Sequence, residues 1–181
     1  MPPPIKVELV PHDPVWAEIA AEESLRLKEA LGALLVVVHP IGSTAIPEIH
    51  AKPIVDLMPV VGNLQQFDRN QSKIEQLGFR WWGELGLPGR RYCTKNDPAT
   101  MVRLVQLHCY EQGSPEIVRH VAFRDYLCRH PRLARQYEQM KTECQLQHPN
   151  DSHAYSECKS KWIQRIELEA IAFFAPVLPV D

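Results

Sequence analysis

The residues best suited to chemistry in this sequence are a small-residue turn and a lone acid that follows it. Gly42-Ser43 comes after a short apolar run, and Asp56 lies inside a second apolar run over residues 54–61. Backbone N–H groups beside a glycine can approach phosphate oxygens closely, and a carboxylate on a strand can hold Mg²⁺. We therefore expect Asp56 to be a catalytic Mg²⁺ ligand, in a layout suited to the transfer of a nucleotidyl group. The phosphate would be bound by Gly42, Ser43 and Thr44.

Both features also have an ordinary structural explanation. Most Gly-Ser pairs are simple turns, and an aspartate at the end of a strand can cap a neighbouring loop. Asp56 lies between Val55 and Leu57, however, and a carboxylate in a buried strand loses its hydration unless it faces a cleft or a ligand. The acid thus favours a functional site, and the two structural alternatives stay open.

Three cations are expected to balance the phosphate charge: Lys52, Arg91 and Arg103. Lys52 precedes Asp56 by four residues, close enough for its ammonium group to reach a phosphate at the same turn. Arg91 and Arg103 lie in predicted strands, where an unpaired buried cation would be costly, so each should face either a ligand or water. For Lys52 the alternative is a solvated loop position.

His108 is the candidate for proton transfer. It lies in the predicted strand 101–110, on the same face as Gln106 and on the opposite face from Arg103. A strand histidine is more often a hydrogen-bonded core residue. Here it could instead contact phosphate, act as a general base or share a metal with Asp56.

A predicted helix after residue 114 carries further polar residues that we expect to support the site: Arg119, His120 and Arg124. Arg124 is followed by Asp125, so the alternative for this pair is an anchor between the helix and the sheet.

The cysteines show no metal or disulfide framework. There are five, widely spaced and without a CxxC pair: Cys93, Cys109, Cys128, Cys144 and Cys158. We expect reduced thiols in a cytoplasmic protein. Cys144 with His148 and His153 with Cys158 would supply four zinc ligands, but their spacing matches no common zinc ribbon or finger, so no zinc is expected.

Length and composition predict one globular domain. The 181 residues are 45% hydrophobic and 23% charged, and 20 basic against 22 acidic residues give a net charge of −2. This balance argues against a nucleic-acid partner and is compatible with a small phosphorylated ligand. The first residues lack the apolar core of a signal peptide, and the aliphatic run 34–38 is too short to cross a membrane.

The apolar patterns predict an α/β (α+β) fold, with a mixed sheet flanked by helices and followed by a C-terminal helical bundle. The single domain 1–181 would consist of a mixed-sheet core over 1–112 and a helical subdomain over 113–181. Helices are expected over 13–32 and 64–77 and from 114 onward, and strands over 34–38, 54–61, 79–82, 90–95 and 101–110. The glycine-rich stretch 83–89 reads as a loop able to cover a ligand.

The sequence resembles the GrpB family of small proteins. The matching motifs follow one another along nearly the whole chain: VPHDPVW (10–16), IGSTAIP (41–47), AKPIVDL (51–57), LHCY (107–110), RHVAFRDYL (119–127) and Tyr155 with Lys159. The resemblance implies a fold similar to that of nucleotidyltransferases and adds Lys159 to the residues that support the site.

In that superfamily a Gly-Ser turn is followed by an acid–x–acid pair on the next strand. The first acid corresponds to Asp56, but the second position is Met58, which cannot bind Mg²⁺. A third acid is expected on a later strand, where this chain has His108, with Glu111 near the strand end as a substitute.

Two functions therefore compete. The first is nucleotidyl transfer with Mg²⁺ from a nucleoside triphosphate to a small acceptor. The second is a catalytically inactive module that binds a nucleotide or phosphorylated metabolite, suggested by Met58 and the cationic set Lys52, Arg90, Arg91 and Arg103. An interaction domain with a vestigial cleft is the third possibility, and the sequence indicates no oligomeric state.

Overall fold

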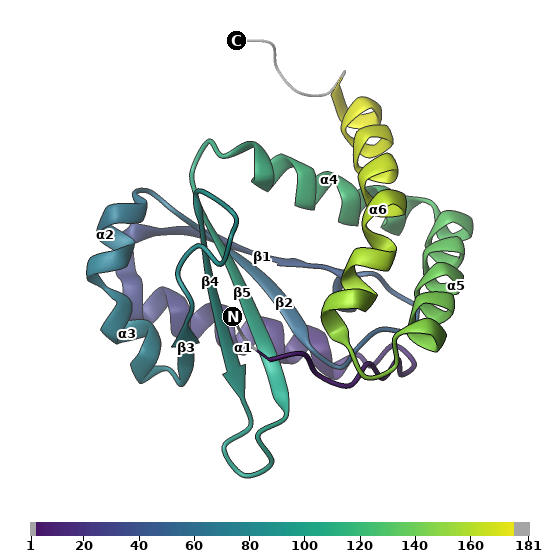
Figure 1. Cartoon of the computed structure of the whole chain (residues 1–181). Helices are drawn as coiled ribbons and strands as arrows, with labels where there is room; N and C mark the ends of the chain where they lie inside the picture. The colour runs from purple at the N-terminus through teal and green to yellow at the C-terminus, as the bar shows by residue number, and fades with distance from the viewer. Residues whose placement is uncertain (1–2, 176–181) are drawn as a thin grey trace.

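The computed structural model describes residues 3–175, and they form a mixed sheet with helices on both faces (Figure 1). The strands are β1 (Leu35–Ile41), β2 (Val55–Val61), β3 (Phe79–Trp81), β4 (Arg90–Asn96) and β5 (Arg103–Glu111). The helices are α1 (Val15–Leu31), η1 (Gly32–Leu34), η2 (Ser43–Ala45), α2 (Leu64–Arg69), α3 (Gln71–Gln76), α4 (Pro115–Arg129), α5 (Pro131–Gln147) and α6 (Ser152–Phe174). The predicted fold class is confirmed.

The strand order β1-β2-β5-β4-β3 places the candidate residues in the middle of the sheet. β2 and β5 are parallel neighbours, and the other pairs are antiparallel. Asp56 pairs in register with Ile41 of β1 on one side and with Gln106 of β5 on the other. Two segments that are 50 residues apart in the sequence are thereby brought side by side.

The helix expected over 64–77 is interrupted at Asn70, where α2 ends and α3 begins. The Asn70 side-chain amide donates to the carbonyl oxygen of Gln66 at 2.8 Å. An asparagine side chain that bonds to the backbone competes with the helical hydrogen bonds, which explains the break.

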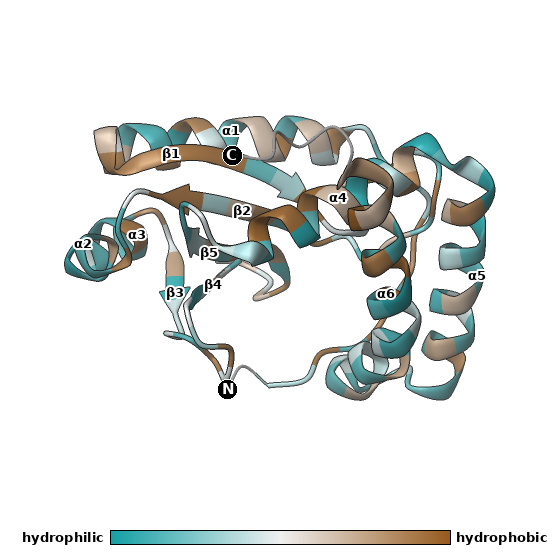
Figure 2. Ribbon diagram, turned by 90° about the horizontal axis from the view of Figure 1, so that it is seen from above, coloured by the Kyte–Doolittle hydropathy of each residue, from teal (hydrophilic) through white to brown (hydrophobic). Residues whose placement is uncertain are grey.

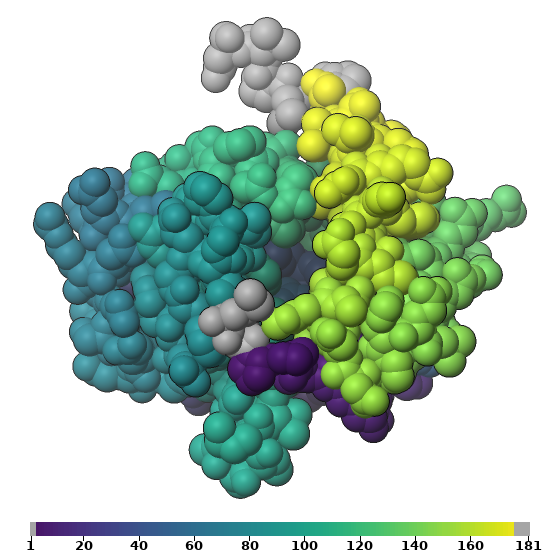
Figure 3. All heavy atoms as spheres, viewed as in Figure 1, coloured from purple at the N-terminus to yellow at the C-terminus, as the bar shows by residue number. Residues whose placement is uncertain are grey.

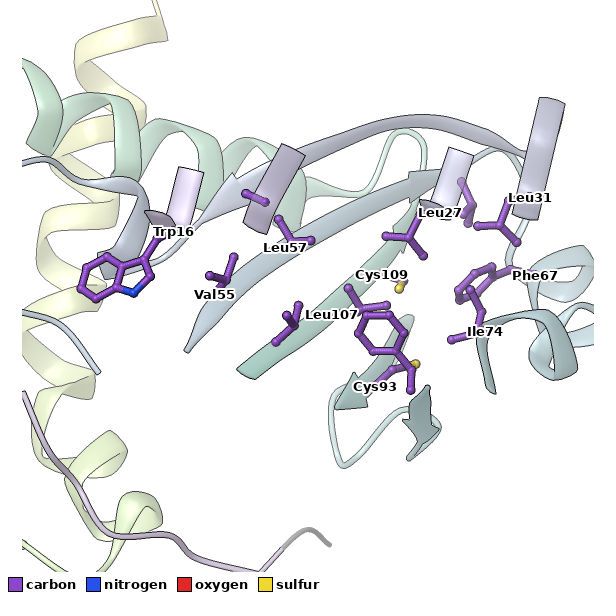
Figure 4. Close-up of a cluster of buried hydrophobic side chains, with 14 of the residues drawn as sticks. Trp16, Leu27, Leu31, Val55, Leu57, Phe67, Ile74, Cys93, Leu107 and Cys109 are labelled. Carbon is purple, nitrogen blue, oxygen red and sulfur yellow. The ribbon is translucent and has the colours of Figure 1, made fainter. Parts of the chain in front are cut away.

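One face of the sheet is covered by α1, which lies over β1 and β2 (Figure 2). The core on this face is built from aliphatic and aromatic side chains of the strands, α1 and the α2–α3 segment (Figure 4): Trp16, Leu27, Leu31, Val55, Leu57, Phe67, Ile74, Cys93, Leu107 and Cys109. Because strand side chains alternate, Asp56, Met58, Gln106 and His108 lie on the opposite face.

That opposite face meets the helical bundle. Met58 and Tyr110 pack with Ile41 against α4. The predicted C-terminal bundle is formed by α4, α5 and α6, whose shared core includes Phe123, Leu127, Tyr137 and Ile166. Two residues of the segment after η2, Ile46 and Ile49, also belong to this core and are almost fully buried, so the Gly-Ser turn is tied directly to the bundle.

The expectation of five reduced thiols is wrong for Cys144 and Cys158, which form a disulfide between α5 and α6. Cys93 and Cys109 are free and buried, and Cys128 is free and exposed. The two disulfide residues are also two of the four conceivable zinc ligands. Cysteine spacing could not reveal the pair, because it depends on how two helices face each other.

None of the described helices is both long and apolar enough to span a membrane.

Reduction of the disulfide should lower the free energy of unfolding. The two cysteines are 14 residues apart. Closing a loop of this size reduces the conformational entropy of the unfolded chain and thereby stabilises the folded state by about 3 kcal/mol. Chemical unfolding of Cys158→Ser should show this loss, whereas Cys128→Ser at the exposed free thiol should stay near wild type. Equal stability of wild type and Cys158→Ser under oxidising conditions would contradict the assignment.

Candidate functional site

A cleft of about 360 Å³ lies between the sheet, the turn after β1 and helices α4 and α6. Figure 3 shows its opening between α6, in yellow, and the teal strand region. The structure brings most of the sequence-predicted site residues to this cleft: Gly42, Ser43, Thr44, Lys52, Asp56, His108, Arg119, His120 and Lys159. Three others, Arg91, Arg103 and Arg124, do not line it.

Gly42 and Asp56 form the floor of the cleft. Gly42 has φ of 70°, a region that side chains disfavour, and a Cβ atom at this position would lie 2.6 Å from Asp56 Oδ2. Only a glycine therefore allows the turn to pass this close to the carboxylate. The Asp56 side chain is 29% exposed, so the acid faces the cleft and is not enclosed in the sheet.

The turn itself offers backbone donors. Ser43 begins the short helix η2, in which Ala45 and Ile46 donate their N–H groups to Gly42 and Ser43 carbonyl oxygens. Among residues 3–175 the N–H groups of Ser43 and Thr44 have no acceptor, as is normal at the start of a helix. The Ser43 hydroxyl donates to the Tyr137 hydroxyl of α5 at 3.2 Å, which fixes the turn against the bundle.

His108 stands beside Asp56 on the cleft face. Its Nε2 atom lies 3.4 Å from Asp56 Oδ1, and its ring meets the Tyr92 ring edge-on at 5.2 Å between centroids. His120 of α4 lies nearby, and burial together with Arg119 and His108 lowers its pKa to about 3. His120 is therefore neutral. Of the two histidines, His108 is the one that contacts Asp56.

Two lysines share the cleft with Asp56, and the other carboxylate that lines it, Glu167, is ion-paired with Arg119. Lys52 and Lys159 place their ammonium groups 5.5 Å and 4.2 Å from the centre of the Tyr155 ring. Burial lowers the pKa of Lys52. Burial, with the nearby charges of Lys52 and Lys141, lowers the pKa of Lys159 to about 7, while Asp56 opposes this shift. Neither lysine has an ion-pair partner in the described part of the chain, so the positive charge here is incompletely balanced.

Two predicted supporting residues are structural. Arg119 is ion-paired with Glu116 and with the buried Glu167 of α6, and it joins α4 to α6. Arg124 pairs with Asp125 and donates to the carbonyl oxygen of Pro40 in β1 at 2.7 Å. The pair thus anchors the helix to the sheet, as the structural alternative proposed.

The structure places Arg91 outside the cleft, on the other face of the sheet. Its guanidinium group binds both oxygens of Asp68 in α2 at 2.6 and 2.7 Å and also contacts Glu84. This ion pairing neutralises the half-buried Arg91 without a ligand. This ion pair could not be predicted from the sequence, because Asp68 is distant from Arg91 along the chain.

Arg103 lies on the face opposite to the one predicted. The pairing of β4 with β5 shifts between Lys95↔Val105 and Asn96↔Arg103, which leaves Leu104 as an extra residue. Such a bulge re-aims the side chains that precede it. Arg103 therefore lines a second hollow of about 320 Å³ together with Gln106 and His108. Alternation alone could not show this.

The donors around Asp56 do not fit a resident Mg²⁺ ion. Met58 is fully buried and packs against apolar neighbours, and Gln106 is the residue next to Asp56 on β5. Glu111 accepts a hydrogen bond from the Leu64 N–H at 2.8 Å and does not line the cleft. No group of three acidic, histidine or cysteine side chains arranged for a metal exists within residues 3–175. One carboxylate beside two ammonium groups is a poor cation site.

Several cleft residues were not singled out as site residues by the sequence. Tyr137 and Glu167 lie on α5 and α6, where their spacing matches an ordinary helix face. The sequence shows that the last helix contains glutamates, but only the structure shows that Glu167 is buried and ion-paired with Arg119.

Comparisons with known proteins agree on one family. Residues 6–169 match the family described as GrpB protein. The UPF0157 protein YqkA of Bacillus subtilis (strain 168) is 38% identical over 93% of this chain, which spans 48% of that relative. The crystal structure of GrpB from Enterococcus faecalis superposes with a TM-score of 0.85 at 34% identity, over 92% of this chain and 99% of that one.

A more distant likeness concerns the fold alone. The Cid1 poly(U) polymerase in its Mg 3′-dATP-bound structure gives a TM-score of 0.50 at 12% identity, covering 76% of this chain and 41% of that one. The sheet and its helices thus have a fold similar to that part of the polymerase.

Gly42→Ala should destabilise the protein and displace Asp56. The new methyl group meets the carboxylate at 2.6 Å in a backbone conformation that is already unfavourable, at a total cost of about 2–4 kcal/mol. Gly113→Ala is the matched control, because Gly113 has a φ of 89° with no atom near the added Cβ. Equal losses of unfolding free energy in the two variants would show that the contact with Asp56 is unimportant.

Proposed function

We propose that this chain, which belongs to the GrpB family, binds a small phosphorylated ligand in the cleft between its sheet and α6. A nucleotide or a phosphorylated metabolite has the required charge. The observation that carries the proposal is the pair of lysines, Lys52 and Lys159, which have no ion-pair partner among the described residues and lie in the same cleft as Asp56.

The energetics of this pair favour an anion. Removing an ammonium group from water is costly, and the Tyr155 ring compensates only part of that cost through cation–π contact. A phosphate between the two lysines would offset the rest. The free N–H groups of Ser43 and Thr44 would bind oxygens of the same phosphate.

Nucleotidyl transfer is a second candidate, favoured by the close approach of Gly42 to Asp56. The acceptor hydroxyl would attack the α-phosphorus, and pyrophosphate would leave. In this reaction His108 would take the proton of the hydroxyl, the turn N–H groups would position the phosphates, and Lys52 and Lys159 would neutralise their charge. Mg²⁺ would enter with the triphosphate and supply further charge neutralisation, since residues 3–175 form no metal site of their own.

Asp56→Asn separates the two candidates. A binding module should bind the phosphorylated ligand equally well or more tightly, because a negative charge beside the phosphate has been removed. A Mg²⁺-dependent transferase should lose binding of the triphosphate and its turnover. Thermal-shift screening of nucleotides and sugar phosphates, with and without Mg²⁺, measures this, since a ligand at 100 times its Kd adds about 2.7 kcal/mol of stability.

Strictly Mg²⁺-dependent binding with release of pyrophosphate would replace the first candidate by the second. Absence of any shift with phosphorylated compounds would contradict both.

Anion affinity should fall as the pH rises through about 7. An anion binds the protonated form of Lys159, whose pKa of about 7 in the free protein means that this form is lost between pH 6 and pH 8. Sulfate is the best probe, because its own charge is constant in this range. We expect its Kd to increase by up to about tenfold from pH 6 to pH 8 in a titration calorimeter.

Two variants on α6 test whether Lys159 is the residue that causes the pH dependence of sulfate binding. Lys159→Gln should bind sulfate weakly at all pH values and flatten the profile, whereas Lys161→Gln, at an exposed position on the same helix, should leave the profile unchanged. A profile that survives in Lys159→Gln would assign the titration to another group.

A further inference from the structure

A second hollow of about 320 Å³ adjoins the cleft and shares four lining residues with it: Lys52, Gln106, His108 and Ser156. We propose that this hollow binds a second anionic group of the same ligand, which therefore carries two phosphoryl groups. The inference rests on the proposed function and specifies the class of ligand: a bisphosphorylated molecule or a polyphosphate chain.

Arg103 is the first of two arginines that define the hollow. Its Nε atom is buried and has no hydrogen-bond acceptor within the described residues. A buried donor without an acceptor is costly, and the cost is larger for a charged group. The bulge between β4 and β5 turns this side chain into the hollow, so a local irregularity of the sheet creates the unsatisfied cation.

Arg90 is the second arginine of the hollow. It is only 8% exposed, and its guanidinium group donates to the carbonyl oxygens of Glu84 and Leu85 at 3.4 and 3.1 Å. The same group lies 5.1 Å from the centre of the Tyr92 ring. These neutral partners fix the position of the guanidinium group without cancelling its charge. Burial lowers the pKa of Arg90, as expected for a cation without a carboxylate partner.

The charge balance of this hollow differs from that around two half-buried cations of β4. Its described lining contains Lys52, Arg90 and Arg103 and no aspartate or glutamate. By contrast, Arg91 on the same strand binds Asp68, and Lys95 binds Glu23 at 2.7 Å. Arg91 and Lys95 thus each have a carboxylate from the protein, whereas the three cations of the hollow have no ion-pair partner within the described residues. An anion from solution is the partner that completes the site.

One ligand can reach both positions. Lys52, Gln106 and His108 line both hollows, so the two hollows are adjacent on the same face of the sheet. The phosphoryl group beside Lys159 and the Ser43 turn would occupy the first hollow. The second group would lie between Arg90 and Arg103.

Inorganic phosphate tests the second position directly. In a titration of the wild-type protein followed by the Nε–H resonances of the arginines, Arg90 and Arg103 should shift in a saturable manner. Arg91, already bound to Asp68, is the internal control and should not shift. No response of Arg90 and Arg103 up to tens of millimolar phosphate would overturn the inference.

Variants separate this inference from the proposed function. Arg103→Gln should abolish the response at Arg90 and leave phosphate binding at Lys159 intact, whereas Lys159→Gln should do the reverse. Arg91→Gln is the control for loss of an arginine from the same strand. Phosphate binding that depends on Lys159 but never involves Arg103 would leave the proposed function standing and overturn the second site. If the wild-type protein binds phosphate at neither position, both the proposed function and the second site are overturned.

Probes with two anionic groups test whether one ligand spans both hollows. Tripolyphosphate carries contiguous groups, glucose 1,6-bisphosphate carries separate ones, and glucose 6-phosphate carries one. At least one of the first two should bind about tenfold or more tightly than glucose 6-phosphate, and Arg103→Gln should remove this advantage. Which of the two binds better distinguishes a polyphosphate chain from separated phosphoryl groups. Equal affinity of all three would overturn the inference.

Discussion

The site depends on the contact between the backbone of Gly42 and the carboxylate of Asp56. This contact exists because β1 and β2 pair antiparallel with Ile41 opposite Asp56, so the chain leaves β1 directly over the acid. Any side chain at position 42 would push the turn away. The free N–H groups of Ser43 and Thr44, the hydroxyl contact to Tyr137 and the orientation of Asp56 toward His108 all require that the turn stay where it is.

Within residues 3–175, the groups that surround Asp56 are not those of a metal site. A nucleotidyl-transfer site built on two metal ions needs several carboxylates in one place. In this chain the neighbouring positions hold the buried thioether of Met58 and the amide of Gln106, and the opposite wall contributes the ammonium group of Lys159. The result is a site in which the Asp56 carboxylate lies in the same cleft as two lysines without ion-pair partners among the described residues. Different residues determine the fold and the charge of the cleft. The sheet topology depends on alternating apolar side chains, whereas the charge balance of the cleft depends on only a few side chains.

Sequence patterns predicted those parts of the molecule that depend on local chemistry. The strands around Asp56 and His108, the glycine turn and the amphipathic helices of the bundle follow from periodicity and from short-range conformational preferences. The parts that depend on long-range geometry were not predictable. Arg103 changes face through a bulge, Arg91 is neutralised by a residue 23 positions earlier, and Cys144 meets Cys158 only because α5 and α6 are neighbours. Lys159 was indicated by family resemblance, since nothing in its own helix distinguishes it from other lysines.

The burial of Ile46 and Ile49 in the helical bundle restrains the turn that precedes them. A loop that follows a strand is ordinarily among the first parts of a protein to open. Here the loop is held at one end by the β1–β2 pairing and at the other by the core shared with Phe123 and Ile166. It can open only when the bundle also separates from the sheet. The candidate site therefore has the local stability of the whole molecule, and a shortened chain that keeps the sheet but lacks the bundle would not retain it.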